Sequence, residues 1–503
     1  MSYRRIINVL LIAALLGVSW AQTRLVIGTA TETDDLDPRT ATSIAALHRL
    51  RTVSEPLLVN SPDMELTPRL AESWEYSNDG LTLTFSLREG ISFHHGRTLT
   101  SEDVRYTFEW ILDEANDSPH RSSFMAIESI DTPDDLTVIF NFSEPNVFLL
   151  NQLSNRGIVP ADLGDDPDFG LAPVGTGPFV FEEWVRDDRF VARAFDDYWG
   201  GRAAVDEVVF RPIPENSTRL LALEAGEIDI MQGDVQASEV TRLEEDERFT
   251  VQRVPSLSYT YVAFNVDGSN EMLSDVRVRQ ALSHLMPREA IVANILEGIG
   301  RPGISMLSPD LPWFSDDVPR FDYNPERARE LLAEAGIEEG ELSFTLHVQD
   351  NAVRTQIAEI FAFEAQQVGI DITIIVEELA ALQQRINQTR DFELFILGWA
   401  GMAEPDQAMF RQWHSEGSLN RPGYSNPELD ALLERGRTLD PQSEESLELY
   451  AQAQRIILED ATYVFVFYTE EIGVHRSDLS GWQVHPGNTA AWQDLHLVRF
   501  TND

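Results

Sequence analysis

The sequence predicts an α/β protein with two lobes and an additional β-rich subdomain. Three observations support this fold class. At 503 residues the chain is too long for a single hydrophobic core, and 43% of its residues are hydrophobic, enough to fill several cores. Predicted strands alternate with predicted helices through most of the sequence, which is typical of α/β lobes. Between residues 56 and 172 apolar and polar residues alternate instead, which indicates a β-rich insertion.

Residues 1–21 predict a secretory signal peptide. Arg4 and Arg5 precede an apolar run that ends shortly before the small residue Ala21. That run is too short for a membrane span, and no later stretch has the ~18 uninterrupted apolar residues that a transmembrane helix needs. The chain has no cysteine, so it can form no disulfide and carry no lipid-bearing cysteine. We expect a monomer that is soluble in the periplasm after cleavage and is not lipid-anchored.

The charge balance is strongly acidic. Asp and Glu number 84 against 38 basic residues, which gives a net charge of −46, and loss of Arg4 and Arg5 with the signal makes it −48. This excludes nucleic acid as a partner, because phosphate binding needs a basic surface. All 38 basic residues are arginine. High-GC codon bias and life in a saline medium, where salt screens self-repulsion, both remain open as explanations.

The sequence predicts α/β structure for the first lobe on both sides of the insertion. Its predicted elements are strands at residues 25–28 and 228–230 and helices at 44–53 and 217–225. Gly226 is expected to end the second of these helices. Gly175 and Gly177 predict a turn that the backbone can make only without a side chain.

The inserted segment carries two β-like runs and one helix signal. Apolar residues alternate strictly with polar residues from Leu81 to Leu87, and residues 136–142 form a second such run. Between them, Thr100 and Asp103 have the spacing of a capping box, which predicts the start of an amphipathic helix.

The second lobe contains two copies of one helix-start signal, Asn324-Pro325 and Asn426-Pro427. Gly336 fits the end of the first of these helices. Strands are predicted at 258–265, 342–348, 370–376, 392–397 and 462–468, and further helices at 353–367 and 443–458. This alternation predicts a largely parallel sheet. Because no low-complexity linker separates the lobes, we expect strands to run between them and to act as a hinge.

These patterns give the following predicted boundaries. The signal peptide covers 1–21, the first lobe 22–55, 173–265 and 478–503, the inserted subdomain 56–172, and the second lobe 266–477.

No motif in the sequence predicts catalysis or a cofactor. Nucleophile-elbow, zinc-protease, phosphate-loop and dinucleotide-binding patterns are all missing from it. His94 and His95 are adjacent, but neighbouring residues on a strand point to opposite faces and no third ligand lies nearby in the sequence. We therefore expect structural histidines, no metal site, no cofactor and no catalytic residues.

Five segments, in order, resemble the family 5 extracellular solute-binding proteins, which are the oligopeptide-, dipeptide- and nickel-binding components of ATP-binding-cassette (ABC) importers. They are residues 71–104, including Ala71-Glu-Ser-Trp-Glu-Tyr76 and Phe93-His-His-Gly96, then Pro173-Val-Gly-Thr-Gly-Pro-Phe179, Val276-Arg-Val-Arg-Gln-Ala-Leu282, Tyr323-Asn-Pro-Glu-Arg-Ala-Arg-Glu-Leu-Leu-Ala-Glu-Ala-Gly336 and Tyr424-Ser-Asn-Pro-Glu-Leu-Asp430. The resemblance implies a periplasmic-binding-protein clamshell (type II, cluster C) with an extra β-rich subdomain. It also implies a ligand buried between the lobes and delivery to an ABC importer permease.

The resemblance also implies two ligand-facing segments. One is the loop at residues 40–44, with Thr42, Ser43 and Ile44; the other is the segment 397–406, with Trp399, Gly401, Met402, Glu404 and Asp406. Peptide-binding members have an aspartate, which pairs with the peptide's amino terminus, where this chain has Met402. Glu404 or Asp406 could replace that aspartate. Trp399 could stack on a sugar ring, a peptide side chain or a flat heterocycle.

Three further residues are weaker ligand candidates. Tyr261 and Tyr424 could contribute aromatic contacts. Arg354 could bind an anionic group, although a solvated helix face also explains it.

The ligand class stays open at this point. A short peptide or peptide-like solute is the first expectation, because it is the commonest ligand that the resemblance implies. Oligosaccharides, opines and metal chelates are alternatives within the same family, and an extracytoplasmic enzyme or chaperone is a less favoured reading.

Overall fold

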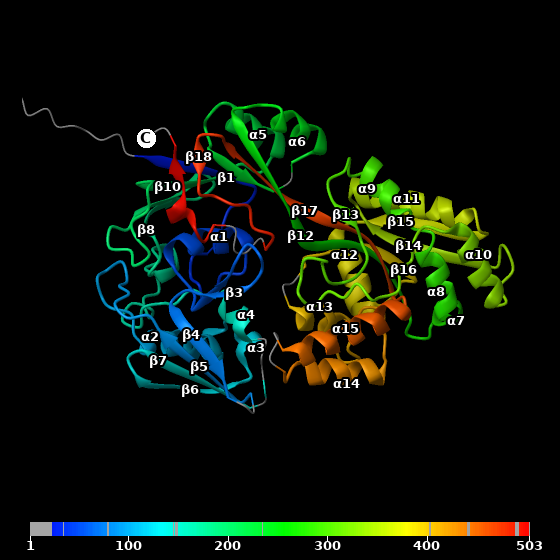
Figure 1. The fold of residues 1–503 in the computed structure, drawn as a ribbon, viewed down its shortest axis with the longest axis horizontal. Coiled ribbons are helices and arrows are strands. Elements are labelled where there is room, and N and C mark those ends of the chain that lie inside the picture. Colours follow the sequence, from blue (N-terminus) through cyan, green and yellow to red (C-terminus); the bar gives the residue numbers. More distant parts are fainter. Residues whose placement is uncertain are drawn as a thin grey trace, which may run out of the picture.

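The protein is represented by a computed structural model, which describes residues 23–33, 35–77, 80–143, 145, 149–233, 235–401, 404–439, 443–487 and 492–501. The predicted signal peptide and Met402 lie outside these described residues. Two lobes lie side by side and are joined by strands that pass from one into the other (Figure 1). None of the helices in the described ranges has the length and apolar character of a membrane span.

One mixed sheet of 11 strands extends through both lobes. Its order is β15 (Ile370–Glu377), β14 (Leu342–Gln349), β16 (Leu394–Trp399), β12 (Phe249–Phe264), β17 (Tyr463–Arg476), β11 (Ile230–Gln232), β1 (Arg24–Thr29), β10 (Glu207–Pro212), β9 (Arg189–Ala194) and β8 (Phe179–Val185), with β13 (Arg301–Pro302) beside β17. β14 is parallel to β15 and β16, but β12 and β17 run antiparallel to their neighbours. The prediction of a largely parallel second-lobe sheet is therefore right only for its outer three strands.

β12 and β17 form the connection between the lobes. At one end β17 pairs with β11 in the first lobe, and at the other end it pairs with β13 in the second. β12 pairs with β17 along most of its length and with β16 from Tyr259 to Phe264. The register of this pair is irregular between Pro255 and Tyr259, where the strands pass from lobe to lobe. Two continuous strands with a local irregularity are a suitable hinge.

The first lobe packs around its five strands. Its helices are α1 (Ile44–Val53), α5 (Asn216–Glu224) and α6 (Ala237–Glu244), and the short pair β18 (Leu479–Ser480) and β19 (Arg499–Phe500) completes it. Trp482 and Trp492 from the C-terminal segment stack at 5.5 Å inside the same core as Leu25 and Phe179.

Gly175 and Gly177 pack against the end of α1. A Cβ atom at Gly175 would lie 2.2 Å from the carbonyl oxygen of Val53, and one at Gly177 would lie 2.6 Å from that of Thr52. Neither glycine has a positive φ. The chain bends at residues 176–178, and the side chain that this bend excludes would collide with the end of α1. The two glycines are required because two backbones meet, and the Gly177 N–H donates to the free Val53 carbonyl at 2.9 Å.

The inserted subdomain is a four-stranded antiparallel sheet with helices on it. The order is β4 (Ala71–Tyr76), β5 (Thr82–Leu87), β7 (Thr137–Phe142) and β6 (Ile127–Asp134), and α2 (Ser101–Leu112), α3 (Arg121–Phe124) and α4 (Leu149–Leu153) pack beside it, with the hairpin β2 (Leu58–Asn60) and β3 (Leu66–Pro68) nearby. The predicted capping box is present, because the Thr100 backbone N–H donates to Asp103 at 2.9 Å. The predicted β-rich subdomain is confirmed, while its boundaries at 56 and 172 stay a prediction.

The second lobe has a core on each face of its sheet. Along β12, Tyr259 and Tyr261 face one core and Val262 and Phe264 face the other. The helices are α7 (Glu271–Ser274), α8 (Val276–Ser283), α9 (Arg288–Asn294), α10 (Pro325–Glu334), α11 (Ala352–Gln366), α12 (Leu379–Gln384), α13 (Pro405–Trp413), α14 (Pro427–Gly436) and α15 (Glu444–Glu459). Asn324 and Asn426 cap α10 and α14 as predicted.

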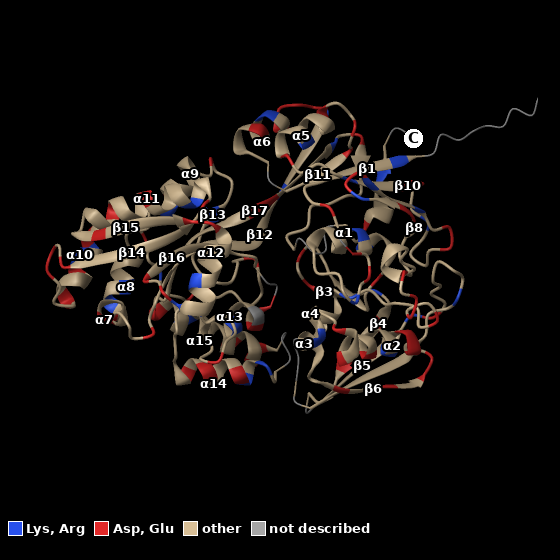
Figure 2. Ribbon diagram, turned by 180° about the vertical axis from the view of Figure 1, so that it is seen from behind, with Lys and Arg blue, Asp and Glu red and all other residues tan. Residues whose placement is uncertain are grey.

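Charged residues cover both lobes. Asp and Glu are spread over outer helices such as α10 and α14 and over many loops, with arginines scattered among them (Figure 2). Most of the arginine–carboxylate pairs among the described residues are partly exposed, as in Arg202–Asp196 and Arg327–Glu330. Each such pair contributes at most about 1 kcal/mol, so these pairs do not offset the repulsion within a chain of charge −46.

We expect the melting temperature to rise when sodium chloride increases from about 0.01 M to 1 M, because the screening length falls from about 30 Å to about 3 Å. Thermal unfolding followed by circular dichroism measures this. The same series near the isoelectric point is the control, since little net charge remains there to screen. A flat or falling melting temperature at pH 7 would contradict the saline interpretation and favour codon bias.

Candidate functional site

The predicted segment 397–406 begins at the carboxyl end of β16. β14 and β16 are parallel, so their carboxyl ends meet at one edge of the second-lobe sheet, where open α/β sheets bind ligands. Trp399 is the last residue of β16 and pairs with Tyr259 of β12. Its side chain is only 8% exposed and packs into the core, and its indole N–H has no hydrogen-bond partner among the described residues.

Gly401 fixes the next part of this segment against the hinge. A Cβ atom at Gly401 would lie 1.7 Å from the carbonyl oxygen of Leu257, and the Gly401 N–H donates to the Ser258 hydroxyl at 3.4 Å. Leu257 and Ser258 lie in the irregular part of β12. The position of the predicted ligand segment therefore depends directly on the hinge.

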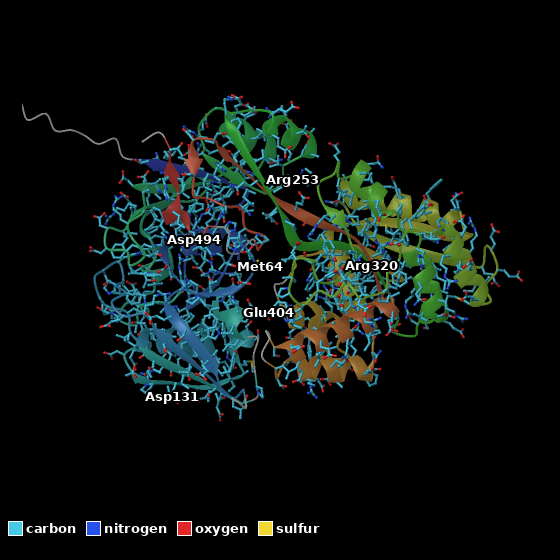
Figure 3. All side chains as sticks on the ribbon, in the orientation of Figure 1. Met64, Asp131, Arg253, Arg320, Glu404 and Asp494 are labelled. Carbon is cyan, nitrogen blue, oxygen red and sulfur yellow. The ribbon has the colours of Figure 1, made fainter. Side chains whose placement is uncertain are left out.

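Glu404 is the most unusual side chain of the segment. It is 3% exposed, and neither carboxylate oxygen has a hydrogen-bond partner among the described residues. It is the N-cap of α13, but its side chain accepts no hydrogen bond from the described residues of that helix. Figure 3 places Glu404 on the side of the second lobe that faces the first, not far from Met64.

The surroundings of Glu404 favour its neutral form. Burial raises the pKa of the Glu404 carboxyl well above its usual range, and the Asp406 charge adds to this. The Asn151 side chain, which belongs to α4 on the other lobe, lowers it slightly but falls short of hydrogen-bond geometry. Among the described residues, a buried carboxyl group without a cation is thus held at the boundary of the two lobes.

Asp406 is equally buried but has a partner. Its carboxylate lies 3.0 Å from the Arg437 guanidinium, which also covers the Phe410 ring at 3.6 Å. Burial raises the pKa of Asp406, and Arg437 acts against that shift. The sequence left Glu404 and Asp406 as equal candidates, and this pairing distinguishes them.

Arg354 lies at the same edge of the sheet. It is half-buried near the start of α11, donates to the Gln349 side-chain carbonyl, and covers Gly398, where a Cβ atom would lie 2.3 Å from its Nη2. Burial lowers its pKa, and nearby Tyr261 acts against that shift. No carboxylate among the described residues forms an ion pair with Arg354.

The two predicted tyrosines lie inside the second lobe. Tyr261 is fully buried, stacks on Tyr463 at 4.4 Å and accepts a hydrogen bond from Arg421 at 2.8 Å. Tyr424 is buried and donates its hydroxyl hydrogen to the Asp460 carboxylate. These contacts account for both side chains without a ligand.

The predicted first-lobe segment forms the start of α1. Ser43 caps this helix, since its hydroxyl oxygen accepts from the Ala46 N–H at 3.1 Å. Thr42 is exposed and Ile44 is 45% exposed. These two side chains are free to meet a ligand, whereas Ser43 has a structural bond.

Met64 and Asn151 are first-lobe residues that the sequence did not single out. Met64, in the turn between β2 and β3, has a positive φ of 62° and packs against the second-lobe core. Asn151 approaches Glu404 from α4. The Pro62-Asp63 turn signal could have marked the first, but nothing local marks Asn151.

A family model for bacterial extracellular solute-binding proteins, family 5 (middle), matches residues 65–420, which is more than half of the chain. The chain belongs to this family. The predicted family and the predicted two-lobed fold class are therefore confirmed.

Two relatives of this chain are named for the peptides that they bind. The oligopeptide-binding protein AppA of Bacillus subtilis is 30% identical over 444 residues, covering 83% of this chain and 81% of AppA. The dipeptide-binding protein of Escherichia coli is 28% identical over 457 residues, covering 84% of each chain.

Two solved structures share the fold of this family member. The ABC transporter substrate binding protein CtaP from Listeria monocytogenes matches with a TM-score of 0.86 at 26% identity, over 95% of this chain and 99% of CtaP. AppA from B. subtilis in complex with a nonapeptide matches with a TM-score of 0.74 at 28% identity, over the same shares.

Proposed function

We propose that this family 5 protein captures a short peptide or peptide-like solute between its two lobes and delivers it to the permease of an ABC importer. The observation that carries the proposal is Glu404, a buried carboxyl group that has no cationic partner among the described residues where the lobes face each other. A cationic ligand group would supply that partner. The peptide ligands named for AppA and for the E. coli relative support this choice.

Glu404 takes the role of amino-group anchor in this proposal. An uncharged carboxyl group is tolerable in a buried site, but a carboxylate there needs a cation. An arriving ammonium group would take the place of Asn151 beside Glu404 and make the ionised form favourable. Trp399, with its unpaired indole N–H, and the exposed Thr42 and Ile44 complete the candidate contacts from the two lobes. A neutral oligosaccharide would leave Glu404 without a charge partner.

The expectations about export, oligomeric state, catalysis and domain boundaries form part of the same proposal. The protein is exported, loses residues 1–21, and acts as a soluble periplasmic monomer without a lipid anchor. It releases its ligand unchanged and catalyses no reaction. Domain boundaries near residues 56, 173, 266 and 478 belong to the same proposal: the inserted sheet supports the first two, whereas β12 and β17 cross between the lobes before residues 266 and 478.

Ligand binding should close the lobes. The sequence of AppA is more similar to this chain than that of CtaP, yet the peptide-bound structure of AppA gives the lower TM-score. This supports a different arrangement of the lobes in the peptide complex.

We expect native mass spectrometry of freshly purified protein to show a retained small ligand. Small-angle scattering should then show a smaller radius of gyration after that ligand is added back to ligand-free protein. An unchanged radius at saturation would overturn the proposed closure, and turnover of the ligand would indicate an enzyme.

A further inference from the structure

The two lobes also meet on the back of the hinge, opposite Glu404. Figure 1 shows α6 and α9 on one side of β12 and β17, and Figure 3 shows Met64 and Glu404 on the other side. A groove of about 650 Å³ lies on the side of α6 and α9. One wall comes from the first lobe around α6, the other from the second lobe at the end of α9, and β17 forms its floor.

Arg253 connects the two lobes across this back face. It belongs to the first-lobe half of β12, and its Nη2 donates to the Gly298 carbonyl of the second lobe at 3.0 Å. Its Nε lies 2.7 Å from the carboxylate of Glu470, a hinge residue of β17. The Glu470 carboxylate also accepts the Gly300 N–H at 3.3 Å. The loop between α9 and β13 is therefore held down on the hinge by a charge-assisted set of hydrogen bonds.

Ile299, in the same loop, adds an apolar contact. Its side chain belongs to the second lobe but packs against the first-lobe cluster that includes Val235, Val240 and Ile472. The loop is tightly curled, because Gly298 and Gly300 have φ values of 84° and 129°. A Cβ atom at Gly300 would lie 2.8 Å from the Tyr468 carbonyl oxygen, so the loop stays on β17 and moves with the second lobe.

These contacts exist in the arrangement described here. Rotation about β12 and β17 that brings the front faces together separates the back walls, because the strands lie between front and back. Closure must then break the Arg253–Gly298 hydrogen bond and expose Ile299. Opening the front again requires the groove to narrow.

We propose that the contacts on the back of the hinge set the balance between open and closed lobes, and thereby the apparent affinity for ligand, without touching the ligand. The inference rests on the hinged closure of the proposed function and not on the identity of the ligand. Weakening the back contacts should raise the fraction of molecules with closed lobes, because these contacts stabilise the open arrangement. Filling the groove should raise the same fraction, because the groove must narrow when the lobes open. Apparent affinity scales with the closed fraction when only the closed form binds fully.

The test uses two variants that change the groove in opposite ways. Ile299→Ala removes the apolar contact, and Ser238→Trp places a large side chain in the groove from an exposed position of α6. Since the chain has no cysteine, Asp131→Cys and Arg320→Cys can carry a pair of spin labels, one on each lobe. Pulsed electron resonance on the ligand-free, full-length mature protein then gives the distribution of distances between the lobes.

We expect both variants to increase the population at short distance by at least about twofold relative to the labelled parent. Thr241→Trp, on α6 but outside the groove, is the matched control and should leave the distribution unchanged. Thermal unfolding confirms that each variant is folded. An unchanged or longer distance in folded Ser238→Trp or Ile299→Ala would overturn the proposal, even where ligand binding itself is intact.

Discussion

A Glu404→Gln variant should bind a peptide with a free amino terminus at least about a hundredfold more weakly than the wild-type protein. An ammonium group that loses its buried charge partner costs roughly 3 to 5 kcal/mol, and each ~1.4 kcal/mol is a factor of ten in the dissociation constant. Calorimetry with the retained ligand, or with a short peptide and its amino-acetylated form, measures this. In the wild type, acetylation should cause a comparable loss; in the variant it should cause almost none.

Glu378→Gln is the matched control for this experiment. Glu378 is also a helix N-cap without a side-chain capping bond, but it is exposed. The control should bind like the wild type. If Glu404→Gln loses less than tenfold in peptide affinity, Glu404 is not the anchor of the amino group, and another acid binds that group.

The same variant should change the pH dependence of stability. The pKa of Glu404 is raised in the folded protein above its unfolded value of about 4.3. The folded protein therefore holds this proton more tightly, and the stability that it contributes is lost as pH rises through the folded pKa. Glu404→Gln has no proton to lose, so it should melt at a higher temperature than the wild type at pH 8, with little difference near pH 4.

Local signals in the sequence were sufficient for many elements. The helix predicted at residues 44–53 matches α1, and Asn324 and Asn426 begin α10 and α14. Such signals work because a cap satisfies backbone N–H groups within three residues of itself. The family motifs likewise led to the correct fold class.

The hinge strands were predicted at about half their length. Apolar residues indicated strands at 258–265 and 462–468, whereas β12 begins at Phe249 and β17 continues to Arg476. The missing halves contain Pro255, Glu470 and other polar residues. They are strands because they pair with each other and with β11, and pairing between distant segments leaves no periodic trace in either one.

Contacts between residues that are distant in the sequence also limited the prediction of the site. The segment from Trp399 to Asp406 was found through resemblance, but the sequence could not separate Glu404 from Asp406. The distinction comes from Arg437, 31 positions beyond Asp406 in the chain, which pairs with that acid alone. Asn151 reaches Glu404 only because an inserted subdomain folds back toward the second lobe.

Gly401→Ala should displace the ligand segment and abolish tight binding. The added methyl group would lie 1.7 Å from the Leu257 carbonyl oxygen, and real Cβ atoms do not approach backbone that closely. Because Leu257 lies on a hinge strand, the segment between Trp399 and Glu404 must move away from β12. Such overpacking typically costs about 1 to 3 kcal/mol of folding free energy, so the variant should still fold.

Denaturant unfolding and calorimetry of Gly401→Ala separate these two effects. The free energy of unfolding should fall by about 1 to 3 kcal/mol. Peptide affinity should fall by more than about a hundredfold, because a displacement of Glu404 removes the proposed partner of the ammonium group. Gly200→Ala is the control, because Gly200 is exposed on the first lobe, its φ is ordinary and its Cβ would meet only the Tyr198 side chain. If Gly401→Ala binds the peptide as the wild type does, the segment after β16 is not part of the ligand site, and the anchor must lie elsewhere between the lobes.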